Sequence, residues 1–186
     1  NYLKEELNIS LIQTELFWED PAKNIFHFTD IISGIKNEVD IIILPETFTT
    51  GFSMKKELAE QESTTINWMK KMATNKQAAI AGSFFVNEGG KCYNRLHFIE
   101  PDGKVTIYNK KHLFRLTKED AIFTAGNKQI IVDYKGWKIS LMVCYDLRFP
   151  VWMRRSEKHD YDMILLVANW PEKRSFAWNQ LLIARA

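Results

Sequence analysis

Two short runs of this sequence, 40–44 (DIIIL) and 162–167 (DMILLV), are wholly apolar after their first residue. A strand that is covered on both faces has this pattern, whereas a strand with one face in water alternates apolar and polar residues. The cover on each face must come from helices or from a second sheet. These runs therefore predict a layered α/β fold with buried strands.

Helix signals lie between the predicted strands. Asp20 and Pro21 are residue types that begin helices, as the N-cap and the first-turn residue. Apolar residues then recur with the spacing of one helix face, at Ile25, Phe28, Ile31, Ile32, Ile35 and Val39. Further helices are expected over 64–76, from about Pro150, and over 176–186.

The middle of the chain has the pattern of β-hairpins. Segments 78–86 and 91–100 flank a Gly-containing turn at 87–90, and 104–110 follows a second turn at 101–103. Three further strands are predicted at 8–13, 129–134 and 137–143. The sum is the α/β class with a mixed sheet, and because no repeat or linker interrupts the pattern, we expect one domain over 1–186.

Charge and cysteine content limit the functional classes. Lys and Arg number 25 against 23 Asp and Glu, a formal charge of +2, which gives no electrostatic case for binding nucleic acid or an anionic membrane. No apolar run approaches the ~18 residues that span a bilayer, and the first ten residues have no signal-peptide pattern. Because Cys92 and Cys144 are too few for a disulfide framework, we expect a reduced, cytoplasmic protein.

Three residues that carry chemistry stand at the ends of predicted strands. Glu46 follows the run 40–44, Lys110 ends the strand 104–110, and Cys144 ends the strand 137–143. Each alone has a structural explanation: a solvated carboxylate, a surface lysine, or a small core thiol. Strand alternation also allows only one of Lys110 and Lys111 to face a given pocket.

Taken together, the three residue types suit nucleophilic catalysis. A thiol with a pKa near ~8.5 needs help to attack at neutral pH. Glu46 can accept its proton, and a lysine can stabilise the thiolate and the developing oxyanion. Backbone N–H groups in the turn after Cys144 can also bind an oxyanion. The set predicts a nucleophile, a general base and an electrophile.

The segments around these residues resemble the nitrilase superfamily of carbon–nitrogen hydrolases. The matching stretches are 44–48 (LPETF), 108–114 (YNKKHLF), 143–150 (VCYDLRFP) and 166–171 (LVANWP). The stretch 45–54 (PETFTTGFSM), together with 112–115 (HLFR), looks most like the omega-amidase branch. Members of that branch hydrolyse the terminal amide of 2-oxo dicarboxylic monoamides such as 2-oxoglutaramate and 2-oxosuccinamate.

The resemblance implies roles for individual residues. It makes Glu46 the general base, Lys110 the catalytic lysine and Cys144 the nucleophile, and it selects Lys110 over Lys111. The family usually has arginine where this chain has Asn109. Strand alternation points position 109 away from the site, so we expect the departure to have no effect.

Further site residues are expected around this set. Glu119 is the best match to the second glutamate that the family places near the site, and the backbone N–H of Tyr145 would join the oxyanion hole. Substrate-binding candidates are Phe48, Phe52, Arg148 and Trp170. The three aromatic residues could line the acyl pocket, with a place in the core as the alternative. Arg148 suits a substrate carboxylate, with a structural ion pair that fixes the turn as the alternative.

The implied fold is a four-layer α-β-β-α sandwich. The implied reaction is attack of the thiol on an amide carbonyl, loss of ammonia, and hydrolysis of the thioester, with no metal or organic cofactor. Four scattered histidines and two distant cysteines show no zinc-ligand spacing. A small-molecule amide is the expected partner, and the resemblance implies a homodimer or a higher homo-oligomer.

Two alternatives stay open. The substrate could be another aliphatic amide, an N-carbamoyl compound or a nitrile, or the chain could be a non-catalytic interaction protein on the same fold. Family members run on past the point where this chain stops, and 181–186 resembles the middle of a helix. We therefore expect a further C-terminal part that completes the domain.

Overall fold

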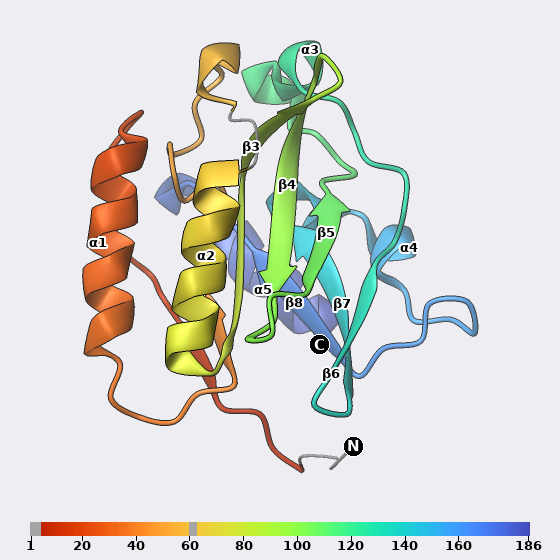
Figure 1. The fold of residues 1–186 in the computed structure, drawn as a ribbon. Helices are drawn as coiled ribbons and strands as arrows, with labels where there is room; N and C mark the ends of the chain where they lie inside the picture. The colour runs from red at the N-terminus through yellow and green to blue at the C-terminus, as the bar shows by residue number, and fades with distance from the viewer. Residues whose placement is uncertain (1–4, 60–62) are drawn as a thin grey trace.

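The computed structural model describes residues 5–59 and 63–186, so the first residues of the N-terminal stretch discussed above lie outside it. Two β-sheets stack face to face, and helices cover the outer side of each sheet (Figure 1). In Figure 1, α1 and α2 lie against the first sheet, and α5 lies behind the second. The architecture is the predicted four-layer α-β-β-α sandwich.

The first sheet has five strands in sequential order: β1 (Ile9–Leu11), β2 (Ile41–Ile43), β3 (Ala79–Glu88), β4 (Lys91–Ile99) and β5 (Val105–Asn109). The first three run parallel, and β4 and β5 add antiparallel neighbours. Ile41 packs between the sheets and Ile42 packs toward the helices, which explains why this strand is apolar on both faces. The hairpin predicted around 87–90 is confirmed, and Gly89 and Gly90 supply its left-handed backbone.

The second sheet has three strands: β6 (Ile131–Tyr134), β7 (Trp137–Val143) and β8 (Met163–Val167). The β6–β7 pair is antiparallel, and β8 runs parallel to β7 with Leu165 opposite Leu141. The second apolar run is therefore a strand, as predicted.

Helices α1 (Pro21–Gly34) and α2 (Ser63–Lys76) lie on the first sheet. The predicted start of α1 is confirmed, because the Asp20 side chain accepts a hydrogen bond from the Lys23 N–H at 3.1 Å. The helix ends at Gly34, so the last two residues of the predicted face, Ile35 and Val39, lie beyond it. Its buried residues are Phe28 and Ile32, as predicted, and Asn24, which the apolar spacing does not include. Its side-chain amide binds backbone oxygens of Phe17 and Thr49, so it ties two loops to the helix. The other short elements are α3 (Glu119–Ile122), α4 (Pro150–Met153), α5 (Ser175–Arg185), η1 (Lys56–Leu58), η2 (Arg115–Thr117), η3 (Cys144–Arg148) and η4 (Glu172–Arg174).

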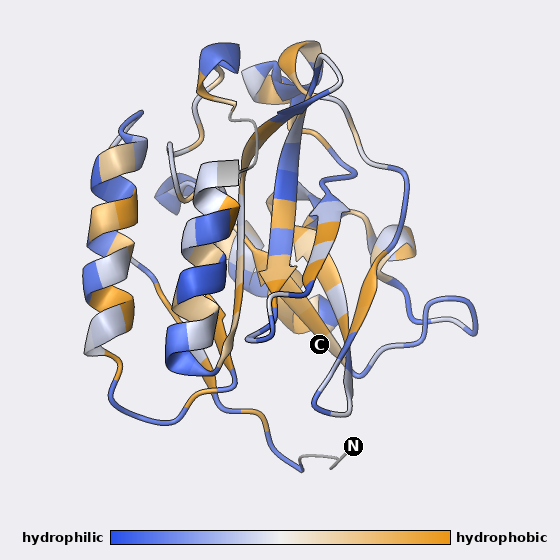
Figure 2. Cartoon of the chain, in the orientation of Figure 1, coloured by the Kyte–Doolittle hydropathy of each residue, from blue (hydrophilic) through white to orange (hydrophobic). Residues whose placement is uncertain are grey.

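Apolar side chains gather in two main layers. Leu96, Phe98 and Leu141 belong to the layer between the sheets, and Phe28 and Ile80 belong to the layer between the first sheet and the helices. In Figure 2, α1 and α2 carry both hydrophilic and hydrophobic residues, and the strands are largely hydrophobic except for the upper part of β4. The two layers hold the strands rigidly, so side chains at the strand ends have fixed positions.

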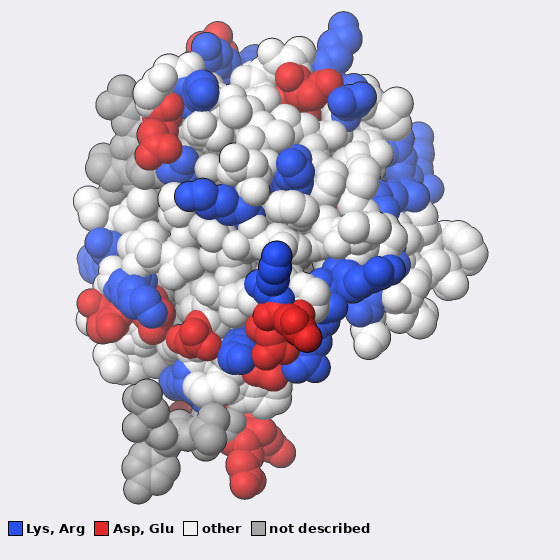
Figure 3. Space-filling model, turned by 90° about the vertical axis from the view of Figure 1, so that its right-hand side faces the viewer, with Lys and Arg blue, Asp and Glu red and all other residues white. Residues whose placement is uncertain are grey.

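The surface is charged with both signs. Lys and Arg side chains are spread among Asp and Glu side chains on the face drawn in Figure 3. Among the described residues, no helix is long and apolar enough to cross a membrane.

Candidate active site

Glu46, Lys110 and Cys144 come from three strand ends. Glu46 lies just beyond β2, Lys110 directly follows β5, and Cys144 directly follows β7. The β2 and β5 strands point the same way in the first sheet, because two antiparallel pairings separate β5 from β3. Their carboxyl ends therefore meet at one edge of the sandwich.

A buried cluster of charged groups occupies this edge. The Lys110 ammonium donates to Glu46 Oε1 at 2.9 Å and to Glu119 Oε1 and Oε2 at 3.1 and 3.0 Å. Asn94 Nδ2, from β4, donates to the same two carboxylates at 2.8 and 3.3 Å. None of the four side chains exposes more than 1% of its surface. The cluster therefore holds two carboxylates and one ammonium away from water.

Cys144 joins this cluster through the backbone of Asn169. The Asn169 N–H donates to Glu46 Oε2 at 2.9 Å, and the Asn169 carbonyl oxygen lies 4.0 Å from Cys144 Sγ. Asn169 follows β8 by two residues, so the fourth strand end contributes main-chain atoms rather than a side chain. The thiol is 8% exposed and borders a cavity.

Burial and charge set the protonation of the cluster. Burial raises the pKa of the Cys144 thiol well above its ordinary value, and the charge of Glu46 adds to this rise while that of Lys110 opposes it. Burial also raises the pKa of Glu119, against the attraction of Lys110. Burial alone would lower the pKa of Lys110, but Glu46 and Glu119 outweigh it and hold that pKa above its usual range. The resting site thus contains a charged lysine and a protonated thiol.

The backbone is left-handed at three places in this site. Cys144 has φ 43°, Thr47 beside Glu46 has φ 50°, and Lys118 beside Glu119 has φ 61°. This region is uncommon for residues other than glycine. At Cys144 it makes a sharp turn between strand and helix, the type of turn that presents a nucleophile.

The two adjacent lysines separate as alternation requires. Lys110 points into the charged cluster, whereas Lys111 places its ammonium 5.4 Å from the ring centroid of Trp152, on α4. Gly126 packs against this strand end and donates its N–H to the Lys110 carbonyl at 2.9 Å. A Cβ at position 126 would overlap the carbonyl oxygen of Asn109, so only glycine fits there.

A small cavity of about 80 Å³ opens beside the thiol. Its walls include Phe52, Tyr145, Arg148, Trp170 and Arg174. The Arg148 guanidinium lies 5.4 Å from the Trp170 ring centroid. In the part of the chain that the structure describes, neither arginine pairs with an acidic side chain. Arg174 was not among the sequence candidates, although it closely follows the stretch 166–171.

Two expectations for this region do not fit the structure. Phe48 is fully buried among the α1 and α2 side chains, with ring centroids 5.5 Å from Phe28 and 5.8 Å from Trp68, so it packs in the core and does not line the cavity. The ion pair expected as the alternative for Arg148 is also not formed with any described carboxylate. Asp146, the acidic residue of this turn, bonds to other partners.

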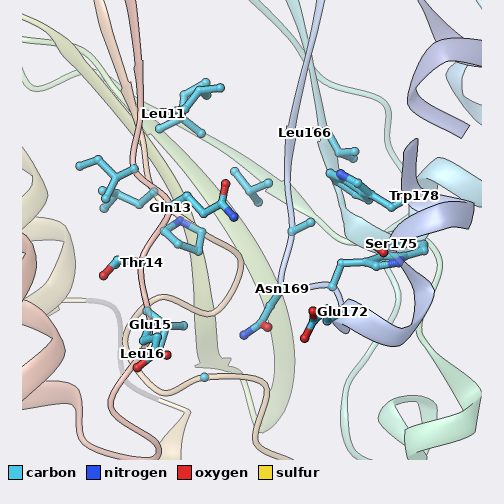
Figure 4. A pocket seen from close by; sticks show the side chains of 18 of the residues that line it. Leu11, Gln13, Thr14, Glu15, Leu16, Leu166, Asn169, Glu172, Ser175 and Trp178 are labelled. Atoms are coloured by element: carbon cyan, nitrogen blue, oxygen red, sulfur yellow. The ribbon is translucent and has the colours of Figure 1, made fainter. Parts of the chain in front are cut away.

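A larger groove of about 900 Å³ lies next to the cavity (Figure 4). Gln13 and Thr14, from the segment after β1, face Leu166 and Trp178 across it. Asn169 lines both the groove and the cavity, but Glu46, Lys110 and Cys144 do not line the groove. Of these three residues, Cys144 alone lines the smaller cavity, whereas Glu46 and Lys110 are buried. Within residues 5–59 and 63–186, no three His, Cys, Asp or Glu side chains are grouped to hold a metal ion.

Comparison with known proteins gives consistent matches. The family model described as carbon–nitrogen hydrolase matches residues 8–186. The omega-amidase YafV of Escherichia coli K12 is 45% identical over 183 residues, which is 97% of this chain and 70% of that protein. The 2-oxoglutaramate amidase of Bacillus subtilis is 33% identical, over 96% of this chain and 71% of that protein.

A solved structure shows the same architecture. A CN-hydrolase superfamily protein of Xanthomonas campestris, crystallised with an arsenic adduct in its active site, superposes with a TM-score of 0.92. It is 38% identical, and the match covers 98% of this chain and 72% of that one.

Proposed function

Because this chain belongs to the carbon–nitrogen hydrolase family, we propose that it is a thiol amidase that cleaves the terminal amide of a small omega-amide, a 2-oxo dicarboxylic acid monoamide. The observation that carries this proposal is the buried Glu46–Lys110 ion pair next to Cys144, whose thiol borders the cavity. The names of the omega-amidase and 2-oxoglutaramate amidase relatives support the substrate class.

In the first step, the Cys144 sulfur attacks the amide carbonyl carbon. Since the thiol is protonated in the resting site, its proton passes to the Glu46 carboxylate as the carbon–sulfur bond forms. The carbonyl oxygen gains negative charge, which the Lys110 ammonium and the Tyr145 N–H stabilise. The dry surroundings of Lys110 strengthen this attraction.

In the second step, Glu46 returns the proton to the amide nitrogen, and ammonia leaves as the carbon–nitrogen bond breaks. A thioester to Cys144 remains. Glu46 then accepts a proton from a water molecule that attacks the thioester, and the released thiol recovers that proton. The balance is one amide and one water converted to one acid and one ammonia. Glu119 binds Lys110 throughout and fixes the ammonium in place.

The cavity walls suit the rest of the substrate. Phe52 and Trp170 provide apolar surface for a short acyl chain, and the Arg148 guanidinium suits the far carboxylate. Arg174 adds a second positive charge at the same wall. The proposal also includes a cytoplasmic homodimer, and the two cysteines, both free, agree with a reduced compartment.

The test is ammonia release from 2-oxoglutaramate. Cys144→Ala should lower kcat by at least about a thousandfold, because no other described thiol lines the cavity. Cys92→Ala is the matched control, since it removes the other buried thiol in a separate core cluster. Retained hydrolysis by the Cys144→Ala protein contradicts the proposal. Glutamine, an N-carbamoyl amino acid and a nitrile, tested beside 2-oxoglutaramate, distinguish the other substrate classes.

A further inference from the structure

Asp146 is a fully buried carboxylate two residues after Cys144. Its Oδ2 accepts hydrogen bonds from the Tyr108 hydroxyl at 2.7 Å and from the Val143 N–H at 3.0 Å. Its Oδ1 accepts from the His112 N–H at 2.9 Å and lies 2.7 Å from His112 Nδ1. Both oxygens are therefore fully used by donors of the protein itself.

These donors come from two separate parts of the chain that meet at the site. Val143 is the last residue of β7, directly before Cys144, and it belongs to the second sheet. Tyr108 and His112 stand two residues before and two residues after Lys110, at the end of the first sheet. One carboxylate thus joins the turn that carries the thiol to the segment that carries the ammonium.

Two of these donors, Tyr108 and His112, are held in place by further aromatic side chains. The Tyr108 hydroxyl accepts a hydrogen bond from Trp152 Nε1 at 3.1 Å. The His112 ring stacks on Phe149, with centroids 3.7 Å apart and planes 8° from parallel. Trp152 and Phe149 lie just after the turn that carries Cys144. They therefore hold Tyr108 and His112, the two donors from the first sheet, in place.

The geometry points to Asp146 as a positioning residue that sets the distance between the Cys144 thiol and the Lys110 ammonium. This inference rests on the proposed amidase mechanism, in which Lys110 must meet the oxygen that becomes negative when Cys144 attacks. Asp146 does not line the cavity, and its side chain bonds to Val143, Tyr108 and His112. It acts through Val143, Tyr108 and His112.

The hydrogen bonds to Asp146 are important because the backbone of the Cys144 turn is strained. A left-handed residue other than glycine persists only where its surroundings hold it. The Val143 bond to Asp146 fixes the chain at the residue before Cys144. Loss of that bond should let the turn relax, and a displacement near ~1 Å can cost about a hundredfold in rate.

Asp146→Asn tests the inference, because its amide group cannot accept the bonds from all of these donors. We expect kcat for 2-oxoglutaramate to fall about a hundredfold with KM changed less than about threefold. We also expect the rate of Cys144 alkylation by iodoacetamide, measured in the Cys92→Ala background, to change by about threefold or more.

Asp40→Asn is the matched control. Asp40 is 2% exposed and accepts from the Asn8 N–H and the Lys135 ammonium, at the opposite end of β2 from the site. It should lower the melting temperature as Asp146→Asn does, but leave kcat and alkylation unchanged. If both variants lose only melting temperature, Asp146 is a structural residue and the inference is wrong.

His112 offers a second variant pair that does not depend on the fold of Asp146→Asn. An asparagine amide can place its nitrogen where His112 Nδ1 lies, whereas a glutamine amide reaches the Nε2 position. We expect His112→Asn to keep most of the activity and His112→Gln to lose it, and equal activities would overturn the inference. If the wild-type protein hydrolyses no amide, the proposed function fails, and the alkylation rates still decide the role of Asp146.

Discussion

Glu46 and Glu119 share the single ammonium of Lys110 at a buried position. With all three groups ionised, the cluster would hold one uncompensated negative charge, and a thiolate at Cys144 would add another. Charges in a medium of low dielectric are costly unless they are paired. Burial, together with the charge of Glu46, raises the pKa values of Glu119 and Cys144. A proton on Glu119 removes the first excess charge, and a proton on Cys144 prevents the second. In the proposed mechanism, the resting site therefore holds a protonated thiol beside Glu46, the general base.

Glu119→Gln tests this balance through stability. In the unfolded chain Glu119 loses its proton near its ordinary pKa of 4.5, whereas the folded protein keeps it to higher pH. Between these two values the folded state binds more protons, so the free energy of unfolding falls as pH rises. In Glu119→Gln this fall in the free energy of unfolding does not occur, because glutamine does not titrate. We expect its stability relative to the wild type to grow as pH rises through that window, measured by urea unfolding.

An exposed carboxylate provides the comparison for this experiment. Glu57→Gln, on η1, removes an exposed carboxylate and is measured in parallel over the same pH range. If the difference between Glu119→Gln and the wild type varies with pH no more than that of Glu57→Gln, the charge argument is contradicted.

Site residues that stand at the ends of strands could be predicted from the sequence, whereas site residues inside a strand, or those that contribute only backbone atoms, could not. Glu46, Lys110 and Cys144 each interrupt a pattern at a predictable edge. Asn94 lies inside β4, where one polar residue has the appearance of ordinary strand alternation. The contribution of Asn169 is its backbone, which carries no residue-type signal.

At the scale of elements, the end of β5 depends on a glycine from a distant loop. The Gly126 N–H donates to the carbonyl oxygen of Lys110. The backbone at Gly126 lies so close to the carbonyl oxygen of Asn109 that no Cβ fits between them. Gly126→Ala should push the loop off the strand end, which costs about 1–3 kcal/mol of unfolding free energy. It should also lower kcat, because Lys110 moves with the strand end. Chemical unfolding and ammonia release measure the two effects.

Gly34→Ala is the control for this change. An added Cβ at position 34 meets nothing within 4 Å, and alanine suits the end of a helix. It should be neutral or stabilising by up to about 1 kcal/mol. Equal effects of the two substitutions would show that Gly126 has no special packing role.

The elements that could be predicted are those that depend on the conformational preferences of their own residues. Asp20 and Pro21 begin α1, and the glycines at 89 and 90 make the hairpin, because their own chemistry favours those conformations. The burial of Asn24 and Phe48 depends on partners elsewhere in the chain, such as Thr49 and Trp68. Such partners become known only when the fold is known.

At the scale of the whole molecule, we propose that the chain is one cooperative domain. The layer between the sheets draws side chains from both sheets, among them Leu96 of β4 and Leu141 of β7. Leu96→Ala should therefore destabilise the molecule by about 2–5 kcal/mol. Far-ultraviolet and near-ultraviolet circular dichroism should show one common transition.

The exposed Leu116 serves as the reference for Leu96. Leu116 keeps 76% of its surface in water, so its substitution by alanine should have little effect. Two separate transitions in the Leu96→Ala protein would show that the sheets unfold independently and that one domain is the wrong description.

Six non-glycine residues of the described chain have a left-handed backbone, and three of them are Thr47, Lys118 and Cys144. Glycine at any of these three positions would relieve the backbone strain. It would also let the site residues leave the positions that the strained backbone gives them. The consequence concerns directed evolution. A screen for heat resistance alone would reward such glycines and drift toward inactive proteins, so a useful screen must select for turnover at the same time.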